Sequence, residues 1–173
     1  MKVCSTVTFA KAKPKSDPAS FHKLTYGLFV LTAKGERENG CVVNTAVQVA
    51  SEPTRISVAV QKENYTRELI EQSGEFNVSV LTEEVPFEVI RHFGMQTGRE
   101  VDKFADFANT AVATNGVRYI NRHTNAFFSA KVVSSADLGS HTLFIGEVTE
   151  AQVLGDAPSC TYAHYHAAIK PKR

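Results

Sequence analysis

The sequence predicts a mainly β fold, in which a small antiparallel barrel carries a few short helices on its outside. About six segments have the length and residue types of strands, and turn residues separate most of them, as expected for hairpins. Helical periodicity is limited to short segments, so the alternating strand–helix units of a parallel sheet are not expected. The chain carries neither G-x-G-x-x-G nor the P-loop pattern, which leaves a Rossmann fold without a motif.

The first three strands are expected in the N-terminal part of the chain. Residues 26–33 are apolar enough for a strand buried on both faces, residues 41–50 form the returning strand, and residues 55–61 form the third. Residues 34–40 should form the first hairpin turn, because their Asn-Gly pair readily supplies the positive φ that such a turn requires. Pro53 belongs to the second connection, because a proline inside a central strand would remove a ladder hydrogen bond.

The next part of the chain changes from strand to helix period and back. Asn64 is a good N-cap for a helix over residues 65–73, and Gly74 is suited to end it as a C′ glycine. Residues 75–81 then alternate apolar and polar side chains with period two, which is typical of a half-buried strand. A second short helix is expected over residues 86–93, whose first residue is a proline that a first helical turn tolerates.

The C-terminal half is expected to contain a long loop followed by two long strands. Residues 94–116 contain several glycines and are loop-like, whereas residues 126–135 and 142–154 have the composition of strands with turn residues between them. Gly146 lies inside the last strand, which indicates either a bulge or a close approach of another part of the chain.

Composition indicates one globular domain over residues 1–173, with an N-terminal arm or edge strand at 1–19 and a docking tail at 155–173. The tyrosines of this tail are expected to pack on a neighbouring subunit. Hydrophobic residues make up 43% and charged residues 21% of the chain. The formal net charge of +1 argues against a nucleic-acid partner, which requires a clear excess of Lys and Arg. No apolar run approaches the roughly 20 residues of a membrane-spanning helix, so no membrane partner is expected.

The cysteines indicate a reducing compartment, and the cytoplasm is the expected location. Cys4, Cys41 and Cys160 lie far apart, and such an odd, sparse set does not resemble a disulfide framework. No C-x-x-C pair is present, so neither structural zinc nor a rubredoxin-type iron has support. The spacing of Cys160, His164 and His166 could suggest a metal site, but no acidic residue lies close by in sequence, so no metal is expected.

The second and third strands and the helix start that follows them contain more hydroxyl and amide groups than a core requires. Asn44 and Thr45 interrupt the first apolar run, and Lys62, Asn64 and Thr66 follow the third strand. A phosphate is held by a cation together with hydroxyl or amide donors, and the N-terminus of a helix is suited to an anion. From the residues alone, a bulge at the interruption and a solvated lysine explain the pattern at least as well.

Five segments, in this order along the chain, resemble the flavin reductase-like family: YGLFVLTAKG, NGCVVNTAVQVASEPTRISVAVQKENYT, GEFNVSVL, HFGMQTGREVDKF and GSHTLFIGEV. The similarity extends over residues 21–153 and is greatest to NAD(P)H:flavin and NADH:rubredoxin oxidoreductases. It implies the FMN-binding split β-barrel, an antiparallel Greek-key barrel with peripheral helices. Each segment alone is moderately specific, and their common order gives the resemblance its weight.

The resemblance also implies a site for FMN. The isoalloxazine ring would contact Val43, Asn44, Thr45 and Ala46, and the ribityl chain and phosphate would contact Ser51, Lys62, Asn64 and Thr66. The segment with Phe93 and Gly94 and the loop over residues 98–104 would cap the flavin, often at a homodimer interface. This chain departs from much of the wider family at Ala46 and Val47, where a second Ser or Thr is expected, and at Glu52, where Asp precedes the proline.

The resemblance implies roles for three further residues, with alternatives left open. His141 matches a histidine near the nicotinamide pocket, where it would position the carboxamide or supply a proton. A strand-end histidine bonded to a loop carbonyl explains this residue equally well. Arg99 and Lys103 would contact a nucleotide phosphate or the partner subunit, and a solvated loop is the better explanation for Arg99 alone. Cys41, by contrast, is interpreted as a small buried hydrophobic residue without a redox role.

Together these implications predict an FMN-dependent oxidoreductase that takes hydride from NADH or NADPH. The acceptor is expected to be free flavin, ferric iron or a small redox protein that is a separate molecule. Two alternatives stay open. One is an FMN-binding electron carrier without its own nicotinamide site, and the other is a pyridoxamine-phosphate-oxidase-like or haem-binding split barrel.

Overall fold

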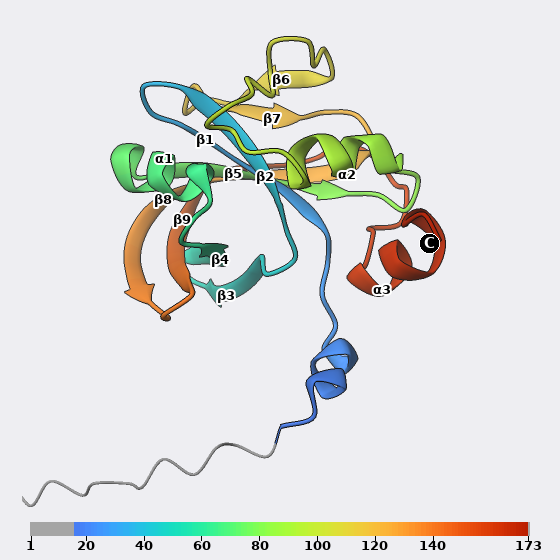
Figure 1. The fold of residues 1–173 in the computed structure, drawn as a ribbon. Helices are drawn as coiled ribbons and strands as arrows, with labels where there is room; N and C mark the ends of the chain where they lie inside the picture. Colours follow the sequence, from blue (N-terminus) through green and yellow to red (C-terminus); the bar gives the residue numbers. More distant parts are fainter. Residues whose placement is uncertain (1–15, 173) are drawn as a thin grey trace, which may run out of the picture.

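A computed structural model describes residues 16–172 of the 173-residue chain. Most of the predicted N-terminal arm therefore lies outside the described residues. The described part starts with a 3-10 helix, η1 (Pro18–Lys23), whose N-cap Asp17 accepts a hydrogen bond from the Ala19 N–H at 2.9 Å. Figure 1 shows this helix standing away from the sheet, and its Phe21 is 57% exposed.

The centre of the fold is a seven-stranded antiparallel sheet with the order β2-β1-β5-β8-β9-β4-β3. Its strands are β1 (Phe29–Lys34), β2 (Glu38–Val43), β3 (Val47–Ser51), β4 (Thr54–Gln61), β5 (Glu75–Leu81), β8 (Thr124–Asp137) and β9 (His141–Val153). The sheet is strongly curved, and α1 (Tyr65–Ser73) and α2 (Phe87–Gly94) lie on its outside (Figure 1). The predicted mainly β fold with peripheral helices is confirmed.

The first hairpin turn lies before Asn39 rather than at it, so the Asn-Gly prediction is wrong. The chain turns at residues 35–37, and Asn39 and Gly40 are paired with β1 inside the sheet. The Asn39 side chain is buried, and a Cβ atom on Gly40 would lie 2.9 Å from the ring of Phe93. Contacts with distant parts of the chain therefore favour burial of this pair over a turn.

The predicted strand over residues 41–50 consists of two strands separated by a break at residues 44–46. β2 ends before this break, and β3 begins after it at the opposite edge of the sheet, where it pairs with β4. Thr45 stabilises the break, because its Oγ1 donates to the Ala59 carbonyl oxygen at 2.9 Å and accepts from the Ala59 N–H at 3.2 Å. The break thus carries the chain from one edge of the sheet to the other.

The helix and the strand after β4 are confirmed. The Asn64 Oδ1 caps α1 by accepting a hydrogen bond from the Thr66 N–H at 3.0 Å, and Gly74 ends the helix with a φ of 70°. β5 then covers the segment predicted as a strand. The second helix begins one residue later than predicted, because Pro86 is the N-cap of α2 and not part of its first turn.

Gly146 makes the close approach that its place in the last strand indicated. A Cβ atom there would lie 2.8 Å from the Ala130 Cβ and from the ring of Phe76, and β8 shifts register opposite it. Two strands went unpredicted, β6 (Thr110–Val112) and β7 (Arg118–Ile120), which pair with each other. They have three residues each, which is too short to show a period in the sequence.

Two clusters of buried side chains fill the fold and meet at one cavity. The first lies between the sheet and α1 and includes Cys41 and Phe144. The second lies under α2 and includes Phe93 and Phe104. Because Cys41 and Phe93 also line the cavity described below, the packing of both clusters determines its shape.

The C-terminal tail docks on its own chain through α3 (Tyr162–His164) and the π-helical η2 (Tyr165–Ile169). The Cys160 N–H donates to the Leu81 carbonyl oxygen at 2.7 Å, and Tyr165 is buried in the second cluster. Tyr165 is therefore buried by its own chain, and a contact of Tyr162 with a neighbouring subunit stays a prediction. None of the helices within residues 16–172 is long and apolar enough to cross a membrane.

Candidate functional site

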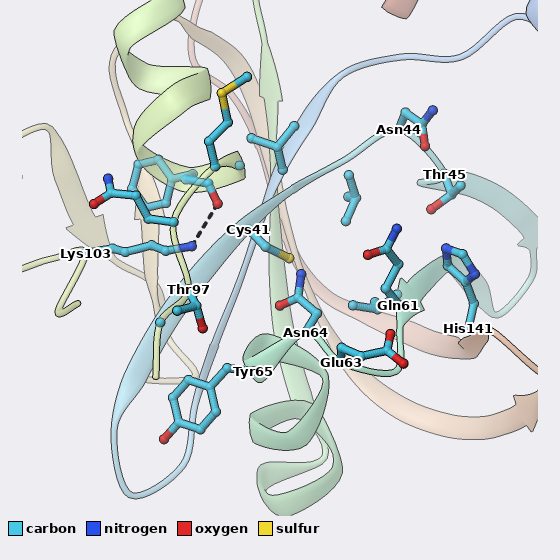
Figure 2. Close-up of a pocket in the computed structure, with 18 of the residues that line it drawn as sticks. Cys41, Asn44, Thr45, Gln61, Glu63, Asn64, Tyr65, Thr97, Lys103 and His141 are labelled. Atoms are coloured by element: carbon cyan, nitrogen blue, oxygen red, sulfur yellow. Dashed lines mark hydrogen bonds between the residues drawn. The ribbon is translucent and has the colours of Figure 1, made fainter. Parts of the chain in front are cut away.

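A cavity of about 500 Å³ opens where β2, the 44–46 break, β4 and the start of α1 meet the loop after α2 (Figure 2). Its volume is within the range of about 300–1,000 Å³ that is typical of small-molecule sites. Most residues predicted to bind a cofactor or to act in catalysis line it: Val43, Asn44, Thr45, Asn64, Phe93, Gly94 and His141.

Four predicted residues do not line the cavity: Ala46, Ser51, Lys62 and Thr66. Ser51 is exposed on β3, and the Lys62 Nζ is paired with the Asp137 Oδ2 at 2.7 Å. Thr66 is fully buried, and its Oγ1 accepts a hydrogen bond from the Asn39 Nδ2 at 3.0 Å. Ala46 packs against the first buried cluster. Ala46 and Thr66 therefore belong to the structure behind the cavity wall.

The 44–46 break places main-chain donors beside the cavity. Within residues 16–172, no backbone or side-chain acceptor is hydrogen-bonded to the N–H groups of Asn44, Thr45 or Ala46. Backbone donors in a folded chain normally have a partner. The N–H groups of Asn44 and Thr45, which line the cavity, are therefore suited to bind the acceptor atoms of a ligand.

The start of α1 adds a second polar region to the cavity. Asn64 and Tyr65 line it, and the N-terminal N–H groups and the dipole of a helix favour an anion. Behind Asn64 lies Cys41, which is 3% exposed. Burial raises the pKa of the Cys41 thiol, and contacts with Thr66 and Asn64 act in the opposite direction.

Lys103 is a buried cation in the wall of the cavity. Its side chain is 2% exposed, and its Nζ donates to the carbonyl oxygens of Gly40 and Phe93, each at 2.8 Å. Burial lowers the pKa of Lys103. The resemblance offered Lys103 as a contact for a nucleotide phosphate or the partner subunit, but its burial was not predicted, because the polar residues around it give no sign of burial. Phe104, the next residue, is the one local hint.

Arg99, from the same loop, is neutralised at the surface. Its Nη1 and Nη2 donate to the Glu68 carboxylate at 3.0 and 2.5 Å, and its guanidinium lies 5.3 Å from the ring centroid of Tyr65. This pairing lowers the pKa of Glu68. Arg99 therefore ties the loop to α1, which differs from the contact with a nucleotide phosphate that the resemblance implied.

His141 opens β9 and lies at the same end of the cavity as Asn44 and Thr45 (Figure 2). Its Nδ1 is 2.8 Å from the Ser140 Oγ, so it contacts a neighbouring side chain and not a loop carbonyl. Sequence reasoning missed Gln61 and Glu63, which also line the cavity. Both flank Lys62, the residue chosen for its charge. Alternation at a strand end places side chains next to each other in sequence on opposite sides.

Metal ligands do not gather in the described part of the chain, where no group of three or more His, Cys, Asp or Glu could hold an ion. In the tail, the His164 Nδ1 lies 3.5 Å from the Glu83 Oε1. Burial raises the pKa of the Cys160 thiol to about 11.

The family model of the flavin reductase like domain matches residues 21–171. The chain belongs to the flavin reductase-like family. It is 41% identical over 157 residues to the ferric-chelate reductase (NAD(P)H) of Archaeoglobus fulgidus. This alignment covers 90% of this chain and 92% of the reductase. It is 44% identical over 151 residues to the high molecular weight rubredoxin of Moorella thermoacetica, which covers 87% of this chain. The chain spans 66% of that relative's length.

Solved structures of low sequence identity share the fold of this flavin reductase-like chain. The NADH:FAD oxidoreductase of Streptomyces globisporus C-1027 superposes with a TM-score of 0.78 at 22% identity, covering 90% of this chain and 95% of that one. An FMN-binding protein of Thermus thermophilus superposes with a TM-score of 0.71 at 21% identity, covering 85% and 82%. These superpositions confirm the predicted split-barrel fold.

The cavity of this flavin reductase-like chain fits FMN in size and in the chemistry of its donors. A flavin ring carries nitrogen and oxygen acceptors along its edge, which the free N–H groups of the 44–46 break complement. A phosphate is favoured by the N-terminus of α1. Val43 and the exposed Met95 add the apolar surface that a flat aromatic ring requires.

Proposed function

We propose that this protein is an FMN-dependent oxidoreductase that takes hydride from NADH or NADPH. It passes the electrons to free flavin, to ferric iron or to a separate small redox protein. The observation that carries the proposal is the cavity beside the 44–46 break, which is lined by Asn44 and Thr45, whose N–H groups are free, and by the start of α1. The ferric-chelate reductase (NAD(P)H) and the high molecular weight rubredoxin among its relatives support this donor and these acceptors.

In this proposal the residues divide between the two ends of the flavin. Val43 and the main chain of residues 44–46 contact the ring, and Phe93 and Gly94 cap it. Asn64 lies toward the phosphate. Thr66 acts indirectly through its hydrogen bond with Asn39. Lys62 and Ser51 are left without direct contacts, because neither lines the cavity.

Bound FMN would supply the hydride acceptor, and the protein would orient the nicotinamide and exclude water. His141 is suited to the nicotinamide side, because its Nδ1 contacts Ser140 and its Nε2 is left to face the ligand. From there it would bind the carboxamide or exchange a proton near neutral pH.

We also infer a homodimer and a cytoplasmic location. A reduced flavin requires walls on both sides that keep water out. Met95 lies beside the cavity and is 56% exposed, so a second subunit placed over it would bury apolar surface and close the site. The sparse cysteines support a reducing compartment.

Anaerobic mixing of the FMN-loaded protein with NADH or NADPH tests the proposed function. The long-wavelength absorbance of oxidised flavin is expected to bleach, and to return when free flavin, a ferric chelate or oxidised rubredoxin is added. Protein that stays oxidised with both nucleotides, but is bleached by a reduced redox protein, is an electron carrier without a nicotinamide site. Failure to bind FMN at micromolar concentration would contradict both functions.

A further inference from the structure

The turn between β8 and β9 leads into His141 and is fastened to the sheet by Lys62. The backbone N–H of Lys62 donates to the Ser140 carbonyl oxygen at 3.1 Å, and the Lys62 Nζ is paired with the Asp137 Oδ2 at 2.7 Å. Lys62 follows β4, whose last residue, Gln61, is paired with His141 in the sheet. The backbone of His141 is therefore fixed on β4, while its side chain lines the cavity.

Contacts inside the turn fix its shape. The Gly139 N–H donates to the Asp137 Oδ1 at 2.7 Å, and Gly139 has a φ of 85°, which glycine adopts without strain. The Leu138 N–H donates to the His141 carbonyl oxygen at 2.9 Å. These contacts determine where Ser140 lies relative to the imidazole that follows it.

The Ser140 hydroxyl contacts the imidazole of His141. Its Oγ lies 2.8 Å from the His141 Nδ1, which is hydrogen-bond distance. Among residues 16–172, neither the Ser140 hydroxyl nor the His141 ring has another hydrogen-bond partner. In a neutral histidine, the hydrogen bond made by one ring nitrogen determines which nitrogen carries the proton. Ser140 is therefore able to determine the state in which His141 meets a ligand.

We propose that Ser140 is a positioning residue for His141. Its hydroxyl donates to Nδ1, so the neutral ring carries its proton on Nε2 and presents this N–H to the carboxamide oxygen of the nicotinamide. This inference rests on the proposed function, in which His141 faces the nicotinamide. It assigns to Ser140 a role that acts through its neighbour and not by contact with the nucleotide.

The charges around the cavity support this direction of the hydrogen bond. A serine hydroxyl can donate or accept, and donation to Nδ1 gives its proton an acceptor within the protein. Glu63 also lines the cavity and has no ion-pair partner in the described part of the chain. A negative charge in the same cavity favours an N–H group over a lone pair on the cavity side of His141.

A fixed ring matters because the side chain of His141 is only half-buried. Without the contact to Ser140, the imidazole would be free to turn about its side-chain bonds and to exchange its tautomers. Hydride transfer depends on the orientation of the two rings, so a carboxamide held by a mobile donor would reach the reactive geometry less often.

Anaerobic stopped-flow of FMN-loaded variants tests the proposal. S140A is expected to be reduced by NADH or NADPH about three- to tenfold more slowly than wild type, which is the free energy of one hydrogen bond converted to a rate. S140T keeps the hydroxyl and should restore the wild-type rate. S135A removes an exposed hydroxyl from the same hairpin and is the matched control. The dissociation constant of FMN should be the same in all of them.

Two further measurements separate positioning from a general loosening of the hairpin. S140A should cause no additional loss in the H141Q background, because Ser140 acts through His141. The second measurement is nitrogen-15 NMR of the histidine rings at about pH 8.5, above the usual range in which imidazole titrates. The signals that H141Q lacks should show the Nε2–H tautomer in wild type and a mixture of tautomers in S140A.

The proposal is overturned if S140A is reduced as fast as wild type, if S140T is as slow as S140A, or if the losses of S140A and H141Q add. An Nδ1–H tautomer of His141 in wild type overturns it as well, and so does an H141Q variant that is reduced at the wild-type rate. FMN-loaded wild type that neither nucleotide reduces contradicts the proposed function itself. In that case the tautomer of His141 still tests the hydrogen bond from Ser140.

Discussion

Thr66 shows how a residue can support the cavity without lining it. Its hydroxyl accepts from the Asn39 side chain, and both residues are buried. The Asn39 Oδ1 has no hydrogen-bond partner among residues 16–172. The bond from its Nδ2 to Thr66 is therefore the hydrogen bond that holds this buried amide in place. The pair joins β2 to the first turn of α1 and so fixes two walls of the cavity relative to each other.

Replacing Thr66 with valine removes the acceptor while keeping the shape of the side chain. We expect T66V to lower the free energy of unfolding by about 1–3 kcal/mol, because the buried Asn39 amide loses its partner. Urea denaturation measures this change. T54V, at the exposed first residue of β4, should stay within about 0.5 kcal/mol of wild type. Equal stability of T66V and wild type would contradict this role for the hydrogen bond.

His141 is a single residue that lines the other end of the cavity (Figure 2). We expect H141Q to slow reduction of bound FMN by NAD(P)H by about 10²-fold, the size of a typical general acid–base contribution. The dissociation constant of FMN should change little, because His141 faces the nicotinamide side in the proposed arrangement. Anaerobic stopped-flow and a fluorescence titration give the two values. A variant with weaker FMN binding and an unchanged reduction rate would place His141 on the flavin instead.

At the scale of elements, the loop over residues 95–104 is held at two points. Arg99 pairs with Glu68 of α1 on the outside, and Lys103 is bonded to β2 and α2 on the inside. Gly98 packs against the Asn39 side chain, where a Cβ atom would clash. This loop forms one wall of the cavity, so its order controls how completely the site forms.

We expect R99Q to increase amide hydrogen exchange in this loop, because the outer attachment is lost while Lys103 still holds the inner one. Exchange followed by mass spectrometry at neutral pH measures the effect, with R37Q as a control. Lowering the pH has the same effect in wild type. The ion pair is present above the usual pKa of a glutamate and is lost as the pH falls through the lowered pKa of Glu68. An unchanged exchange rate in R99Q would show that Lys103 alone orders the loop.

The elements that the sequence predicts well are those with local causes. α1 and β5 follow from a cap at Asn64, a glycine at Gly74 and a change of period, all within a few neighbouring residues. The Asn-Gly pair at Asn39 and the break at residues 44–46 depend on Phe93, Thr66 and Ala59, which are distant in sequence. No local pattern contains those partners, so these two predictions were wrong.

In the candidate site, too, the features with local causes were predicted and those that depend on distant residues were not. Residue type and family order identified Asn44, Thr45, Asn64 and His141, all of which line the cavity. The resemblance also gave Lys62, but strand alternation turns its neighbours toward the cavity, and an ion pair holds Lys62 at the surface. The buried Lys103 ammonium group is held by carbonyl oxygens on β2 and α2. It became visible only in the folded chain.

At the scale of the whole molecule, we expect a dimer whose subunits meet over the cavity. Sedimentation equilibrium should give twice the chain mass of 18.9 kDa. M95K should shift the equilibrium toward monomer, because it places a charge in the apolar contact. M95L, which keeps an apolar side chain at the same place, should not. A wild-type monomer that still binds FMN tightly would contradict the dimer and leave the cavity as a complete site within one subunit.

The cavity beside the 44–46 break is predicted to hold FMN. A crystal structure of the protein grown with FMN tests this claim most directly. The flavin ring is predicted against Val43 and the free N–H groups of Asn44 and Thr45, with its phosphate toward Asn64. A flavin bound elsewhere on the chain, or a cavity without flavin under saturating FMN, would contradict it.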